Sequence, residues 1–236
     1  MRKFILVLFV VVAALTVKSQ NLQVHYDFRS ARNYITTTVE KFAPDAYGST
    51  FFFIDFNYSK AGPTEAYWEI ARELKKWDGP FSVHVEYNGG LHASPLPDNT
   101  MNAFPINNAY LFGGTYSWNA SDFSKGFSLS AMYKYIQTNA SPSNVQLTVV
   151  WYLNMLNNKL SFTGFADFWT EKHTVSNDNF QINFQDVGVV FLSEPQIWYN
   201  INKSFAVGSE VELSYQFAGM AGFNVFPTAA VKWAFN

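Results

Sequence analysis

The stretch that decides the fold is residues 22–29, with the sequence LQVHYDFR, in which apolar letters alternate strictly with polar ones. Successive side chains of an extended strand point to opposite faces, so this segment predicts a strand with one apolar and one ionisable face. The same alternation recurs along the whole chain. The pattern predicts an all-β protein, a transmembrane antiparallel up-and-down β-barrel whose apolar face contacts lipid and whose polar face lines a wet lumen.

The N-terminal segment has the features of an export signal. Arg2 and Lys3 precede an apolar run at 4–17 that is too short to span a bilayer comfortably. We therefore expect a signal peptide at 1–19 and one outer-membrane barrel domain at 20–236, in a Gram-negative bacterium. An uncleaved N-terminal anchor helix is the alternative, and no stop-transfer flank favours it.

Composition narrows the class of protein. Aromatic residues make up 19% of the chain and charged residues 14%, whereas soluble domains carry about 25% charged residues. After residue 20 no apolar run approaches the roughly 18 residues that a membrane helix needs. The hydrophobic residues are therefore distributed by alternation, as in a transmembrane barrel.

Charge and cysteine content exclude other classes. Removal of residues 1–19 deletes Arg2, Lys3 and Lys18, which leaves 13 basic and 18 acidic residues, and no basic patch indicates a nucleic-acid partner. The chain has no cysteine, which excludes disulfides, a thiolate metal site and a lipidated N-terminal cysteine. We expect no cofactor and no metal.

Twelve strands are expected, an even number as in single-chain bacterial barrels. Most are near the roughly 9–11 residues that span a membrane when tilted. Their predicted ranges are 22–30, 33–43, 48–59, 65–75, 80–90, 108–118, 125–137, 144–154, 159–171, 187–200, 204–217 and 223–236.

The lengths of the connections support the same topology. The longest connections, 91–107 and 173–186, follow the fifth and the ninth strand, whereas several connections after even-numbered strands are short. Outer-membrane barrels place long loops outside the cell and short turns in the periplasm. We therefore expect odd-numbered connections to be extracellular.

The segment 64–77, TEAYWEIARELKKW, is ambiguous because it also fits an amphipathic helix. As a strand it would direct Glu69 and Glu73 inward and would leave Arg72 outward near a membrane boundary. Without a strand here the barrel would have eleven strands, so the expected even number requires this segment to be a strand.

Four segments resemble the nucleoside-specific outer-membrane channels, the Tsx-like family, and their barrel relatives. They are TVEKFA (38–43), FFFIDF (51–56), YWEIAREL (67–74) and LSFTGFADF (160–168). The likeness covers the first third of the chain well. It implies a strand at 67–74, a twelve-stranded barrel with a narrow lumen, and nucleosides as the solute.

Strand parity predicts which ionisable groups face the lumen. The set contains eleven acids and three permanent bases, so it favours cations and neutral polar solutes over anions. Arg29 is the expected counterion of Asp27, Glu210 or Glu212, because the first strand should close against the last. The inward set is His25, Asp27, Arg29, Glu40, Asp55, Glu69, Glu73, His84, Glu86, Lys134, Asp167, Glu171, Glu194, Glu210, Glu212 and Lys232.

A solute site is expected where aromatic rings share the inner face with carboxylates. Phe51 and Phe53 lie on the same face as Asp55 and Asn57, so they could stack a base and hydrogen-bond a ribose. The alternative is that the rings only fill space. The predicted solute-binding residues are Phe51, Phe53, Asp55, Asn57, Glu69, Glu86, Phe165, Asp167, Trp169, Glu210 and Glu212, with Arg29 as the charge partner in the lumen.

The leading function is a passive outer-membrane channel for small polar solutes, with nucleosides the best single prediction. Its partners would be the lipid bilayer, the solute and the barrel assembly machinery. The alternative is a non-conducting barrel that serves as a structural or complex-forming subunit. An enzyme would rest on Ser82, His84 and Glu86 on one strand face, but no GxSxG nucleophile elbow occurs. We do not expect an enzyme.

Overall fold

The computed structural model describes residues 19–29, 32–60, 62–95, 101–176 and 184–235. Most of the predicted signal peptide lies outside these residues. In the described ranges, no helix is long and apolar enough to cross a membrane.

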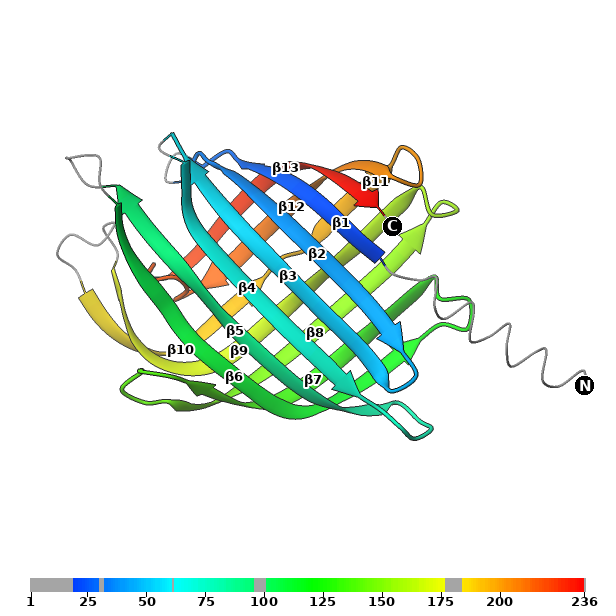
Figure 1. The fold of residues 1–236 in the computed structure, drawn as a ribbon, viewed down its shortest axis with the longest axis horizontal. Coiled ribbons are helices and arrows are strands. Elements are labelled where there is room, and N and C mark those ends of the chain that lie inside the picture. Colours follow the sequence, from blue (N-terminus) through cyan, green and yellow to red (C-terminus); the bar gives the residue numbers. More distant parts are fainter. Residues whose placement is uncertain (1–18, 30–31, 61, 96–100, 177–183, 236) are drawn as a thin grey trace, which may run out of the picture.

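The described chain folds into a single antiparallel sheet of thirteen strand segments (Figure 1). Most of their bounds are close to the predicted ranges, whereas β5, β6 and β9 extend beyond them. They are β1 Ser19–Asp27, β2 Ile35–Asp45, β3 Gly48–Ser59, β4 Gly62–Leu74, β5 Phe81–Pro95, β6 Met101–Asn119, β7 Lys125–Ile136, β8 Ser143–Met155, β9 Leu160–Ser176, β10 Phe184–Ser193, β11 Gln196–Asn200, β12 Phe205–Tyr215 and β13 Phe223–Phe235.

Segments β10 and β11 are two halves of one barrel strand, because both pair with β9 on one side and with β12 on the other. The tenth strand was expected to be continuous, and the structure instead interrupts it at Glu194 and Pro195. Proline has no N–H to donate to the ladder, so it breaks the pairing at this point. With these halves counted together, the protein is a closed antiparallel barrel of twelve strands, as predicted.

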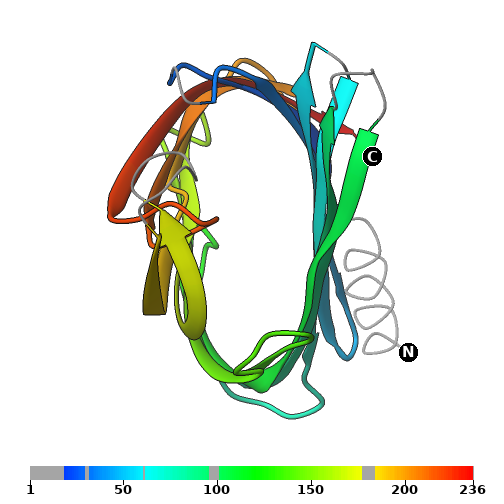
Figure 2. The same ribbon diagram turned by 90° about the vertical axis from the view of Figure 1, so that its left-hand side faces the viewer.

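The barrel closes between the first and the last strand. Strand β1 pairs with β13 from Gln20 opposite Phe235 to Asp27 opposite Thr228. Viewed along the barrel, the wall forms a flattened oval (Figure 2). This pairing of the first with the last strand closes the sheet, which is the condition for a sheet to span a bilayer.

The two ends of the barrel differ in the length of their hairpins. We call the end at which β1 begins and β13 ends the terminal end, and the opposite end the hairpin end (Figure 1). The predicted loops 91–107 and 173–186 are at the hairpin end, and the parts of them that the structure describes, 91–95, 101–107, 173–176 and 184–186, are strand rather than loop. Strands β5 and β6 pair as far as Pro95 and Met101, and β9 and β10 pair as far as Ser176 and Phe184. The pairing therefore continues beyond the strand ranges expected from the sequence.

The ambiguous segment 64–77 contributes the strand β4, as closure required, and not a helix. Its register with β3 and β5 is continuous through Glu69 and Glu73. Arg72 lies on the outer side near the terminal end, where it forms a bidentate ion pair with Asp45 at 2.6 and 2.9 Å. The helical propensity of the segment is therefore overridden by sheet pairing on both sides.

The outer face of the barrel is apolar and exposed. Phe112, Val145 and Leu147 are 61%, 59% and 51% exposed although they lie within strands that are paired on both sides. Such exposure would be unfavourable in water and suits contact with lipid. The expected alternation therefore holds around the wall.

One tight turn at the terminal end requires glycine. Gly48 has φ +135°, and a Cβ atom there would lie 1.8 Å from the backbone oxygen of Glu73. No other residue fits both the dihedral angle and the space, so Gly48 permits the short connection between β2 and β3.

Candidate functional site

The inner wall is polar and closely packed. Most positions that alternation assigns to the lumen are buried or half-buried, and many join neighbouring strands through side-chain hydrogen bonds. The buried polar positions include Asn21, Gln23, His25, Asp27, His84, Asn88, Lys134, Gln146 and Glu212.

The predicted aromatic and acidic patch is formed by β3 and β4. The rings of Phe51 and Phe53 have centroids 6.1 Å apart, and the ring of Phe53 is 6.1 Å from that of Tyr67. Tyr67 donates to Oε1 of Glu69 at 2.7 Å, and Asp55 is directly opposite Tyr67 in the register. Three rings and two carboxylates therefore lie together on one area of the lumen.

Asn57 extends this patch toward the hairpin end. Its Oδ1 accepts from Thr36 at 2.6 Å, and its amide donates to Glu65 at 2.9 Å. The other carboxylate oxygen of Glu65 contacts Nδ1 of His92 at 2.9 Å. This polar row connects the patch to the mouth of the barrel.

The predicted residues on β9 are on the inner face but have a different environment. Asp167 accepts from Thr148 at 2.5 Å. Trp169 is 6% exposed, donates to Glu171 at 2.7 Å, and has the amine of Lys134 4.2 Å from its ring centroid. Phe165 shares their parity. Because the indole is packed on this cluster, it offers little open ring surface to a solute in this conformation.

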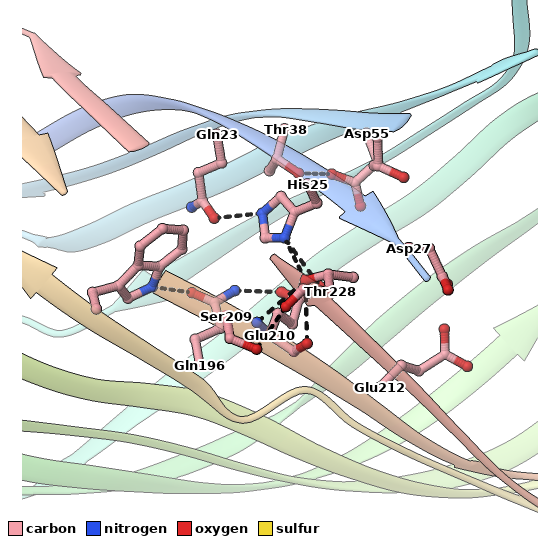
Figure 3. A network of polar contacts seen from close by, with 12 residues as sticks. Gln23, His25, Asp27, Thr38, Asp55, Gln196, Ser209, Glu210, Glu212 and Thr228 are labelled. Atoms are coloured by element: carbon pink, nitrogen blue, oxygen red, sulfur yellow. Dashed lines mark hydrogen bonds and ion pairs between the residues drawn. The ribbon is translucent and has the colours of Figure 1, made fainter. Parts of the chain in front are cut away.

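A second polar network joins β1, β11, β12 and β13 (Figure 3). His25 lies between Gln23 Oε1 at 3.0 Å and Thr228 Oγ1 at 3.2 Å, and its Nδ1 is 3.8 Å from Glu210. Glu210 accepts from the amide of Gln196 at 2.5 Å. These bonds fix the carboxylate of Glu210 against the wall.

The break between β10 and β11 places another acid near this network. Ser193 is opposite Leu213 and Gln196 is opposite Glu210, so Glu194 lies beside the part of β12 that carries Glu210 and Glu212. Three of the predicted acids are thus grouped on neighbouring parts of the wall. Such a grouping produces a negative potential that attracts cations.

The predicted counterion is wrong by three residues. Arg32, not Arg29, pairs with Glu212, through bonds of 2.5 and 3.0 Å, and its guanidinium lies 3.9 Å from Asp27. Arg29 instead donates from its side chain to the backbone oxygen of Val225 at 2.8 Å. Both arginines belong to the β1–β2 connection, where strand parity does not apply, so alternation could not distinguish them.

The arrangement around Ser82 and His84 does not form a nucleophile pair. Ser82 donates to Glu73, and His84 contacts Glu73 at 2.6 Å and Glu86 at 2.9 Å. The base therefore faces two carboxylates and not the hydroxyl, unlike the Ser–His arrangement that activates a nucleophile. In the described part of the chain, no group of three or more His, Asp or Glu residues could hold a metal ion.

Besides Arg32, the sequence prediction missed the lumen residues Tyr67 and Trp198. Tyr67 shares the parity of Glu69, so alternation could have identified it. Trp198 is fully buried, and the amine of Lys232 lies 4.0 Å from its ring centroid. Only the pairing of β11 with β12, and of β12 with β13, brings Trp198 and Lys232 together.

The closed twelve-stranded barrel, polar inside and apolar outside, is the fold of outer-membrane porins. It is similar to the NanC porin, with TM-score 0.56 and 10% identity over 91% of this chain and 98% of that one. It is also similar to the KdgM porin, with TM-score 0.50 and 11% identity over 92% of this chain and 99% of that one. A KdgM structure in complex with disordered oligogalacturonate matches with TM-score 0.51 and 10% identity over the same shares of the two chains.

The chain belongs to the family DUF5020, described as a domain of unknown function, whose model matches residues 19–235. A comparison with curated protein sequences gives no match. At these low identities the solved structures show the fold alone, so the nucleoside specificity implied by the sequence resemblance stays a prediction.

Proposed function

We propose that this protein is a passive channel of the bacterial outer membrane for small neutral and cationic polar solutes, with nucleosides as the preferred class. The observation that carries the proposal is the patch of Phe51, Phe53 and Tyr67 beside Asp55 and Glu69. It combines flat apolar rings with carboxylates on one lumen face. Similarity of fold to porins supports the channel and its membrane.

The charge of the lumen argues against anionic solutes. The KdgM porin is known in complex with oligogalacturonate, a sugar chain with one carboxylate per unit. Here the lumen-facing positions carry more acidic than permanently basic side chains, among them Asp55, Glu69, Glu194 and Glu210. A polyanion entering such a lumen would be repelled, so we expect this channel to reject acidic oligosaccharides and nucleotides.

The patch suits weak and reversible binding of a nucleoside. A base stacked on Phe51 or Phe53 would gain about 1–3 kcal/mol. Ribose hydroxyls that donate to Asp55 or Glu69 would add about 1–2 kcal/mol each. After the cost of association, such contacts correspond to roughly millimolar to high-micromolar binding, which allows release at the other side.

A non-conducting barrel with a structural role is the second candidate. It is favoured by the many hydrogen bonds that inner-wall side chains make with one another. Arg32 binds Glu212 in this way, and Lys134 donates to Gln146. A lumen filled by its own side chains would not pass solute. Measurement of transport decides between these candidates.

The test is solute uptake by liposomes that contain the purified protein. Uridine should enter faster than uridine monophosphate and faster than a neutral sugar of equal size. Phe51→Ala combined with Phe53→Ala should abolish the preference for the nucleoside while general permeability stays equal or rises. Equal rates for all three solutes in the wild type would refute nucleoside specificity, and no uptake at all would favour the structural role.

A further inference from the structure

The connection between β12 and β13, residues 216–222, does not extend away from the barrel. Strand β10 lies between β9 and β12 in the sheet, yet this connection makes hydrogen bonds directly to β9. The amide of Ser176 donates to the oxygen of Gly219 at 2.8 Å, and Ala221 donates back to Ser176 at 3.0 Å. To reach β9 from β12, residues 216–222 must cross one face of β10.

The face that they cross is the inner one. The ring of Phe217 meets the ring of Trp169 edge-on, with centroids 6.0 Å apart, and Trp169 points into the lumen. Val190 of β10 is directly opposite Trp169 in the register and is 1% exposed, so this inward side chain is covered. Nε2 of His173 also contacts the backbone oxygen of Gln216 at 2.7 Å. Figure 2 shows this orange-red segment bending from the wall toward the inside of the oval.

The crossing segment is compact. Gln216, Ala218, Gly219 and Gly222 all have positive φ angles, between 50° and 76°. The amide of Gln216 donates to the oxygen of Gly222 at 3.1 Å, and that of Met220 to the oxygen of Phe217 at 2.9 Å. The segment is therefore a closed turn with its own hydrogen bonds, attached to β9 at two places, rather than a loosely held loop.

The chemistry of the segment differs from that of the lumen below it. Residues 217–222 read FAGMAG and contain no ionisable side chain. An uncharged segment in the mouth restricts passage by volume and gives no preference for charge. The carboxylates of Glu210 and Glu212 on β12, and of Glu194 at the break between β10 and β11, instead supply charge on the inner wall.

We infer that residues 216–222 are the size-limiting element of the channel, with Phe217 as its main obstruction, and that this element is separate from the acidic residues that select for charge. The inference rests on the proposed channel function and adds its size limit. Solutes of the size of a nucleoside pass beside the segment, and uncharged oligosaccharides of three or more units do not.

The test compares single-channel conductance in planar bilayers and entry of the uncharged trisaccharide raffinose into liposomes. Phe217→Ala removes only the ring. A second variant replaces residues 217–221 by Asn-Gly, a sequence that closes a tight hairpin between adjacent strands. The matched control is Phe123→Ala, which removes an equally large and 68% exposed ring from the β6–β7 turn at the terminal end. Heat-dependent gel mobility checks that each variant is folded.

The shortened variant should conduct roughly twofold or more above wild type and admit raffinose, because the obstruction in the mouth is removed. Phe217→Ala should change both quantities in the same direction, while Phe123→Ala should leave them unchanged. If the wild type conducts and neither change at 217–221 alters conductance or raffinose entry, the size-limiting role is wrong and the channel stands. If neither the wild type nor any variant conducts, the proposed channel function and the size-limiting role of the segment are both wrong. Should the shortened variant not fold, the point variant decides.

Discussion

The ion pair between Arg32 and Glu212 offers a quantitative test of the structure. Replacement by methionine, Arg32→Met, keeps the length of the side chain and removes its charge. It leaves Glu212 without the two bonds of 2.5 and 3.0 Å and Asp27 without the guanidinium 3.9 Å away. Both acids are buried in the wall, 7% and 4% exposed, so water replaces the lost partner poorly.

The expected loss follows from burial and geometry. Breaking a buried ion pair by removing one partner costs about 3–5 kcal/mol. The side chain of Arg32 is 18% exposed, so we take a value near the lower end. The guanidinium also lies 3.7 Å from the ring centroid of Phe226, a contact of about 1 kcal/mol. Solvent near the mouth of the barrel screens these charges and reduces the sum of the two contributions. The free energy of unfolding should therefore fall by about 3 kcal/mol in total.

The assay is urea unfolding in lipid vesicles followed by tryptophan fluorescence. Arg29→Met is the matched control, since it deletes the same charge from the same connection. It should cost about 1 kcal/mol, because it removes only an exposed hydrogen bond to Val225 and a contact 5.0 Å from the ring centroid of Phe226. In a double-mutant cycle with Glu212→Gln, the coupling energy should be about 2 kcal/mol. A loss for Arg29→Met as large as that for Arg32→Met, or a coupling energy near zero, would refute the assignment of the counterion.

Further outcomes follow from the fold. The purified protein should give a strand-dominated circular dichroism spectrum and a gel mobility that changes on boiling, and a largely helical spectrum would contradict the barrel. Gly48→Ala should impair folding far more than Gly62→Ala, measured by the folded fraction on gels. Both glycines have positive φ, but only at Gly48 would a Cβ atom collide with Glu73; equal effects would mean that the collision is relieved. Protease added to intact cells should cut within 91–107 or 173–186, and cleavage only at the short turns would invert the topology.

Alternation by itself determined the fold and the orientation of most side chains. The period of two assigned His25, Asp27, Lys134 and Glu212 to the inner face, and all four are buried there. This works because the side-chain direction of a strand depends only on parity once one face is known. The need for closure also decided between strand and helix at 64–77, where local propensity did not.

Side chains outside regular strands were decided only by the tertiary structure. Parity has no meaning in the β1–β2 connection, so the sequence could not show that Arg32 rather than Arg29 reaches Glu212. The strand is interrupted at Pro195 because proline lacks an N–H to donate to the ladder. The alternation of polar and apolar residues carries no information about this break.

The path of residues 216–222 was equally hidden in the sequence. It depends on contacts with Ser176 and Trp169, about 40–50 positions earlier in the chain. Such contacts arise only when the closed sheet places β9 and β12 on the two sides of β10. Local patterns specify which face a residue occupies, whereas the closure of the barrel specifies which residues meet across the lumen.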